Sequence, residues 1–152
     1  NFPDFSGFND PAKGYEAAKG MYENGADVVY AAAGGTGTGM HKAASELGKW
    51  SIGVDADEAT YPAHAAYKKT ILTSMLKRVD NAVFDVIAAA NAGKKVNDSL
   101  GGGVVGRRYS LSSGGIAVSY SGGYINKYKS KIDAAGKAIG SGKIKVPTKP
   151  GK

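Results

Sequence analysis

Short apolar runs alternate along this chain with segments whose apolar residues recur at helical spacing. Residues 27–33, 50–54 and 70–73 have the length and apolar content of buried strands. Helical segments follow the first and the third of these runs. Such alternation is typical of α/β proteins, in which helices flank a mainly parallel sheet. A chain of 152 residues is long enough for one domain with a substantial core.

Four helices are predicted from apolar periodicity and from their start and stop signals. Asp10 followed by Pro11 marks the first helix start, and glycines at 25, 48 and 93 end the first three helices. The expected apolar faces are Tyr15, Ala18 and Tyr22; Met40, Ala43, Ala44 and Leu47; Leu76, Val79, Val83, Ile87 and Ala90; and Ile125, Tyr128, Ile132, Ala135 and Ile139.

The remaining segments are predicted to be two further strands and connecting loops. Residues 104–109 and 115–120 read as strands joined by a turn at 112–115, and residues 56–68 as a loop. The tail from Gly140 is expected to be extended. No strand precedes the first helix, so we expect the alternation to begin upstream of this sequence.

Composition excludes several classes of protein. Without cysteine the chain has no disulfide, no zinc–thiolate site and no cysteine nucleophile. The net charge of +7 comes from the lysines between Tyr124 and Lys152, which are opposed only by Asp133. That stretch reads either as a solvated helix face with a frayed end or as a basic patch for nucleic acid or anionic lipid.

A glycine-rich loop, residues 33–39, lies between a predicted strand and a predicted helix. Backbone N–H groups at such a helix start can bind an anion or a polar ligand edge. Met40 stands where the dinucleotide-binding pattern requires its third glycine, and the P-loop pattern is absent. The glycines therefore serve either ligand contact or close packing of helix and strand.

Four polar side chains outside this loop are of types that occur in functional sites. Asp55 follows a strand, at the end where open α/β sheets bind ligands, although it could equally cap a turn. His41 and His64 have no nucleophile to pair with and read as ordinary surface residues. Lys77 is expected at a helix start, where the dipole does not favour a cation.

Six motifs together resemble the basic membrane protein family of ABC-transporter substrate-binding lipoproteins. They are residues 7–11, 25–30, 33–37, 52–57, 72–80 and 142–146, in the family's order. The resemblance implies a type I periplasmic-binding fold of two α/β lobes with the ligand in the cleft. It also implies that this chain is the C-terminal part. Residues 1–74 would form the second lobe without its first strand, 75–103 a crossover segment of the first lobe, and 104–152 the return to the second lobe and the tail.

The family resemblance also implies a site and a function. Phe8 resembles the aromatic that stacks on a base, Gly34 the glycine that lets backbone approach the ligand, and Asp55 the carboxylate that accepts ribose hydroxyl protons. Lys77 resembles a lysine that donates to the sugar. The expected protein is not an enzyme and has no cofactor or metal.

We expect this protein to bind a nucleoside, with a purine favoured, and to pass it to an ABC permease. Its expected partners further include the missing N-terminal lobe, but no nucleic acid. Its expected location is extracytoplasmic, on the cell membrane, through a lipid on a missing N-terminal cysteine. A sugar or other small metabolite is the alternative ligand. A nucleotide-using enzyme and a basic nucleic-acid binder are the rival classes.

Overall fold

The computed structural model describes residues 5–94, 109–147 and 149. These residues form two compact units, one from the ranges Asn1–Leu76 and Val118–Lys127, the other from Lys77–Ala117 and Tyr128–Lys152. None of the described helices is long and apolar enough to span a membrane. The fold is α/β with a mostly parallel sheet, as the alternation predicts.

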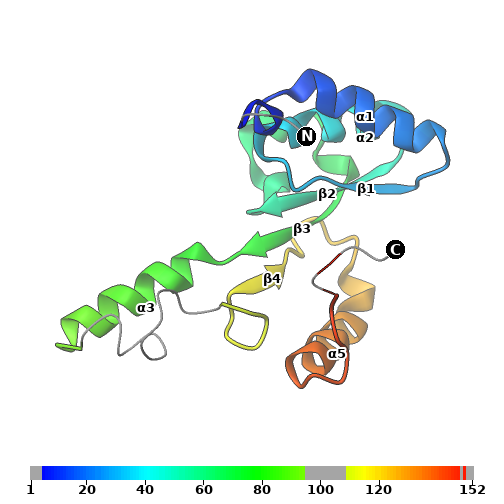
Figure 1. The fold of residues 1–152 in the computed structure, drawn as a ribbon. Helices are drawn as coiled ribbons and strands as arrows, with labels where there is room; N and C mark the ends of the chain where they lie inside the picture. The colour runs from blue at the N-terminus through cyan, green and yellow to red at the C-terminus, as the bar shows by residue number, and fades with distance from the viewer. Residues whose placement is uncertain (1–4, 95–108, 148, 150–152) are drawn as a thin grey trace. The chain divides into compact units, whose positions relative to one another are not determined.

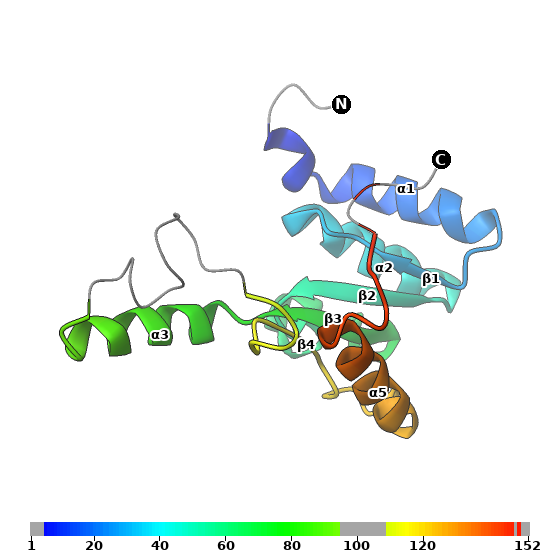
Figure 2. The same ribbon diagram turned by 60° about the horizontal axis from the view of Figure 1, so that its bottom comes forward.

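The first unit holds the parallel part of the sheet. Strand β1 (Val28–Tyr30) pairs in parallel with β2 (Trp50–Asp55), and β2 pairs in parallel with β3 (Ile71–Lys77). Strand β4 (Ile116–Val118) completes the order β1-β2-β3-β4, which Figure 2 shows. Ser119 N donates to Ser74 O and Arg78 N donates to Gly115 O, so β4 runs antiparallel to β3.

Helices α1 (Pro11–Glu23) and α2 (Gly37–Leu47) lie side by side in this unit (Figure 1). The main core lies where they pack on β1, and its buried members are Ala18, Tyr22, Val29, Met40, Ala43 and Ala44. Leu47, predicted to belong to this face, is 40% exposed. Asp10 caps α1 by accepting from Lys13 N, and Pro11 occupies the first turn, as predicted.

Helix α2 begins at Gly37, earlier than the predicted Met40. Its start is preceded by a short 3₁₀ turn, Gly34–Thr36, and it ends at Gly48, whose φ of 63° is left-handed. A Cβ on Gly39 would collide with the backbone of Pro11 and Tyr15 in α1. Part of the glycine loop is therefore helix that lets α1 approach closely, which is the packing role considered above.

Two boundaries around β3 differ from the predictions. The strand runs to Lys77, beyond the predicted Thr73, because Ser74, Met75 and Leu76 pair with Gly53, Val54 and Asp55 of β2. Helix α3 (Val79–Asn91) consequently starts after Leu76 and Lys77. The prediction that Lys77 stands at a helix start was wrong, since it is the last residue of a strand.

The connection between β2 and β3 consists of short 3₁₀ turns at Glu58–Thr60, Pro62–His64 and Lys68–Thr70. Two further strands were predicted at residues 104–109 and 115–120. Residues 104–108 lie outside the described residues, and the segment 115–120 contains β4.

The second unit contains α3 and α5 (Lys129–Gly140), the latter preceded by a 3₁₀ turn at Asn126–Tyr128. Asn81 donates to Gly114 O over 2.8 Å and Tyr109 donates to Asp85 over 3.1 Å, which ties the 109–115 segment to α3. In the described residues α3 buries none of its side chains.

Candidate functional site

The candidate ligand site lies at the carboxyl edge of the parallel strands in the first unit. Gly34 follows the end of β1, and Asp55 is the last residue of β2, the neighbouring strand. Both residues therefore stand at the same edge of the sheet, as their positions in the sequence predict. This edge is where open α/β sheets bind ligands.

Phe8 is brought to this edge by the hydroxyl of Thr36. Thr36 Oγ1 donates to Gly7 O over 2.7 Å and accepts from Asp10 N over 2.8 Å. The segment that carries Phe8, a 3₁₀ turn at Phe5–Phe8, is thereby fastened to the Gly34–Thr36 turn. Phe8 remains 54% exposed, so its ring is available for a ligand.

Gly34 combines an unusual backbone with close contact to Phe8. Its φ is 54°, in the left-handed region where L side chains are strained. A Cβ at this position would lie 3.0 Å from Phe8 O and 3.7 Å from the Phe8 ring atom Cδ1. Any larger residue at 34 would therefore both strain the turn and push against the Phe8 segment.

Asp55 has a left-handed backbone as well, with φ 69°, the only positive value at a non-glycine among the described residues. Its side chain is exposed at the end of β2. A carboxylate of this kind can accept hydrogen bonds from two hydroxyl groups at once. Such backbone strain clusters at functional sites, because surrounding structure must hold it in place.

Lys77 belongs to the second unit, at the end of β3. Phe8, Gly34 and Asp55 thus lie at one edge of the first unit, whereas Lys77 is part of the second unit.

A buried polar network lies behind Asp55 that the sequence reasoning missed. His41 is completely buried and His64 is 5% exposed, so the prediction that both are surface residues was wrong. His41 Nε2 pairs with the carboxylate of Glu58, itself 7% exposed, and His64 Nδ1 lies 3.2 Å from Glu58 O. Helical spacing could have identified His41 as buried, because it lies on the same face of α2 as the buried residues Gly37 and Ala44.

The protonation of this network follows from its contacts. Burial alone would raise the pKa of Glu58, but hydrogen bonds from His41 and Val54 N–H, with two nearby imidazoles, hold the pKa below its usual value. Burial lowers the pKa of His64, and His41 lowers it further, against the opposing effect of Glu58. Both shifts favour a carboxylate at 58 and a neutral ring at 64.

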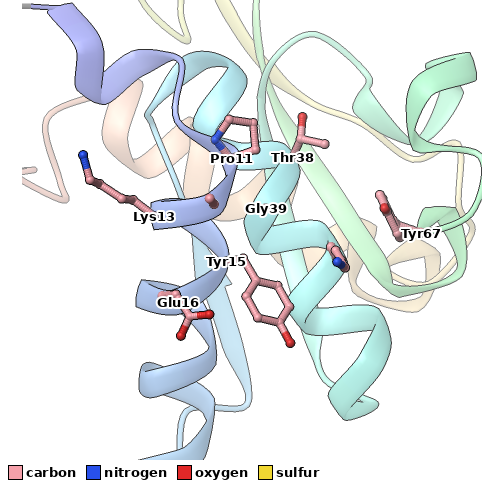
Figure 3. A pocket seen from close by; sticks show the side chains of 9 residues that line it. Pro11, Lys13, Tyr15, Glu16, Thr38, Gly39 and Tyr67 are labelled. Carbon is pink, nitrogen blue, oxygen red and sulfur yellow. The ribbon is translucent and has the colours of Figure 1, made fainter.

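Separately, a pocket of about 680 Å³ lies beside α1 and α2 (Figure 3). Figure 3 shows Tyr15 pointing from α1 toward α2, where its hydroxyl donates to Glu46 over 2.7 Å. Lys42 stacks over the Tyr15 ring at 5.1 Å, and Lys13 pairs with Asp10 at 2.9 Å. The pocket contains none of the four candidate residues, and its two lysines, Lys13 and Lys42, already have protein partners.

Comparison with known proteins agrees with this architecture. The family model for ABC transporter substrate-binding proteins of the PnrA-like type, Bmp, matches residues 3–149. The chain is 38% identical to a CD4+ T-cell-stimulating antigen of Listeria monocytogenes, over 91% of this chain and 40% of the relative. It is 35% identical to the ABC transporter nucleoside-binding protein BmpA of Lactococcus lactis, over 93% of this chain and 42% of that protein.

Among solved structures, an ABC transporter solute-binding protein from Aeropyrum pernix superposes with a TM-score of 0.67 at 26% identity. The match covers 95% of this chain and 46% of the other. The chain therefore spans less than half the length of these relatives. With the family model matched along nearly its whole length, the chain belongs to the Bmp family of PnrA-like ABC transporter substrate-binding proteins.

Proposed function

We propose that this chain supplies one side of a nucleoside-binding cleft in a solute-binding protein of an ABC importer. The observation that carries the proposal is the exposed ring of Phe8 fastened beside Gly34, at the same sheet edge as Asp55. A nucleoside needs a flat apolar surface for its base and an acceptor for its ribose hydroxyls.

In this proposal each residue has a separate task. Phe8 stacks on the base, a contact worth about 1–3 kcal/mol. Gly34 lets backbone approach the ligand, and Asp55 accepts from the ribose hydroxyls. The role of Lys77 as a donor to the sugar rests on its charge and on the family resemblance.

The proposal includes a second lobe that precedes this chain in the full-length protein. Helix α3 supports it, because Val79, Val83, Phe84 and Ile87 are each more than half exposed. A side chain of this size gains about 1.5–3 kcal/mol on burial, so an amphipathic helix with none buried favours an absent partner. We propose that residues 75–103 pack on that lobe, with residues 1–74 and 104–152 forming the other.

Ligand binding would then close the two lobes on each other, because the closed state makes contacts from both sides. The closed form would be the one that the ABC permease receives. The related BmpA of Lactococcus lactis is named as a nucleoside-binding protein, which supports a nucleoside for this chain. We propose an extracytoplasmic location on a lipid anchor upstream of this chain.

Paired phenylalanine variants of the full-length protein test the ligand assignment. Phe8→Ala should weaken binding of inosine and of its free base alike, by roughly 5- to 150-fold from the stacking energy above. Phe5→Ala is the control, because Phe5 is 86% exposed and lies 6.4 Å from the Phe8 ring. Calorimetry showing ribose or another sugar bound as tightly as inosine, with Phe8→Ala harmless, would refute the nucleoside assignment.

Hydrogen exchange tests the place of α3. Its amides should exchange quickly in the 152-residue chain and slowly in the full-length protein, while α1 should exchange alike in both. Equal exchange of α3 in the two proteins would contradict the proposed crossover.

A further inference from the structure

The buried network beneath Asp55 requires one additional proton when the Ser51 hydroxyl donates to the carbonyl of Thr70. Ser51 has one hydroxyl proton and two possible acceptors, Thr70 O at 3.2 Å and His41 Nδ1 at 2.8 Å, and we assign the proton to Thr70 O because a carbonyl can only accept. Ser51 Oγ then accepts from His41 Nδ1, 2.8 Å away. A neutral His41 would consequently turn the lone pair of Nε2 toward the carboxylate of Glu58, and two acceptors repel.

The other groups of the network are balanced without this proton. His64 Nδ1 lies 3.2 Å from Glu58 O and must donate to it, so His64 Nε2 accepts from the Thr38 hydroxyl 3.1 Å away. Glu58 N donates to Ser74 Oγ over 3.1 Å. Every buried side-chain nitrogen and oxygen of the described residues has a partner. The additional proton therefore belongs to the contact between His41 and Glu58.

The second oxygen of the same carboxylate holds the end of β2. Glu58 Oε1 accepts from Val54 N over 3.1 Å, immediately before Asp55. Ala56 N donates to Val54 O over 2.8 Å, so the chain turns sharply around Asp55. Gly53 leaves room for Glu58 to fold back, because a Cβ there would lie 2.9 Å from Glu58 Cβ and 2.5 Å from Ser74 Oγ.

We propose that Glu58 is a positioning residue, which is held by a proton shared with His41 and which fixes the strained turn that presents Asp55 to the ligand. The effect on ligand rests on the proposed function, whereas the proton and the turn do not. Ligand-type atoms of His41, Glu58 and His64 all lie within 4.8 Å of one another, as in a metal site. We assign a proton instead, because both His64 ring nitrogens are already engaged, Nδ1 with Glu58 O and Nε2 with the Thr38 hydroxyl.

Two substitutions at position 58 separate the parts of the proposal. Glu58→Gln can keep its oxygen on Val54 N–H while its amide donates to a neutral His41, so no extra proton is needed. Glu58→Ala removes both contacts. Asp57→Asn is the matched control, since it makes the same charge change on the same loop and keeps an oxygen for Ser121.

Nuclear magnetic resonance and hydrogen exchange on the 152-residue chain provide the ligand-free test. We expect both His41 ring nitrogens to be protonated in the wild type and in Asp57→Asn, and only Nδ1 in Glu58→Gln. Exchange of the Val54 amide should rise about tenfold or more in Glu58→Ala, the equivalent of one lost hydrogen bond, and stay slow in Glu58→Gln. In the full-length protein Glu58→Ala should lose about tenfold in nucleoside affinity, most of which Glu58→Gln restores.

The proposal is overturned by a singly protonated His41 in the wild type, or by stoichiometric zinc on the purified protein with a metal-bound ring nitrogen. Unchanged exchange of Val54 in Glu58→Ala would overturn it as well. A full-length protein that binds no nucleoside, with His41 and Val54 behaving as expected, would refute the proposed function and leave the proton and the turn established.

Discussion

The left-handed backbone of Asp55 makes a prediction that separates fold from function. A non-glycine residue with φ near 69° costs roughly 1–2 kcal/mol, a cost that glycine avoids. Asp55→Gly and Asp55→Ala both remove the carboxylate, but only Asp55→Gly relieves the backbone strain. Asp55→Gly should therefore be the more stable variant, by about 1 kcal/mol after the greater chain entropy of glycine is subtracted.

Ligand binding should be weakened in both variants, including the more stable Asp55→Gly. Both variants lose the acceptor that we assign to the ribose hydroxyls, and a hydrogen bond to a charged group contributes about 1.5–3 kcal/mol. Nucleoside affinity should fall by roughly 10- to 150-fold in each, while affinity for the free base changes little.

Thermal unfolding and calorimetry measure the two halves of this prediction. A difference of about 1 kcal/mol corresponds to roughly 2–4 °C in Tm for a chain of this size. Equal stability of Asp55→Gly and Asp55→Ala would refute the strained turn. Equal loss of nucleoside and base would refute the ribose role, and unchanged nucleoside binding would remove Asp55 from the site.

Three further predictions follow from the core and the tail. Because the pKa values of His64 and Glu58 are lowered on folding, the stability that these two groups contribute should be fully present above about pH 6.5. It should decline as the pH falls and the unfolded state takes up a proton first on His64 and then, below about 4.5, on Glu58; urea titrations of the wild type and of variants at positions 58 and 64 measure it. Gly39→Ala should destabilise the protein by about 1–3 kcal/mol, because the new Cβ would collide with α1. Gly20→Ala has open space around it and should stabilise the protein by up to about 1 kcal/mol, so equal Tm shifts of the two variants would contradict the packing. Deleting residues 143–152 from the full-length protein should leave nucleoside affinity unchanged, because residues 143–147 are exposed, and a large loss in a folded protein would show the tail to be misplaced.

The elements with strong local signals were predictable from the sequence. Asp10 and Pro11 define the start of α1, and Gly48 the end of α2, because capping depends on neighbouring residues alone. The placement of Gly34 and Asp55 at one edge of the sheet was predictable, because parallel strands have their carboxyl ends together. Boundaries set by pairing were not predictable, as the extension of β3 to Lys77 along β2 shows.

The buried network was not predictable for a related reason. The network is formed by three separate segments, which contribute His41, Glu58 and His64. Each of these residue types usually lies on the protein surface. Only the close approach of these segments supplies the partners that make their burial possible. The periodicity of α2 could have placed His41 inward, but no local pattern assigns Glu58 to it.

The central claim, that this chain provides one side of a two-sided nucleoside site, is tested most directly by calorimetry with inosine, guanosine and adenosine. The 152-residue chain, verified as a monomer, should bind all three weakly or not at all, and the full-length protein should bind at least one of them tightly. Tight binding by the monomeric chain would contradict the two-lobe site, and a full-length protein that binds none of the three would contradict the nucleoside assignment.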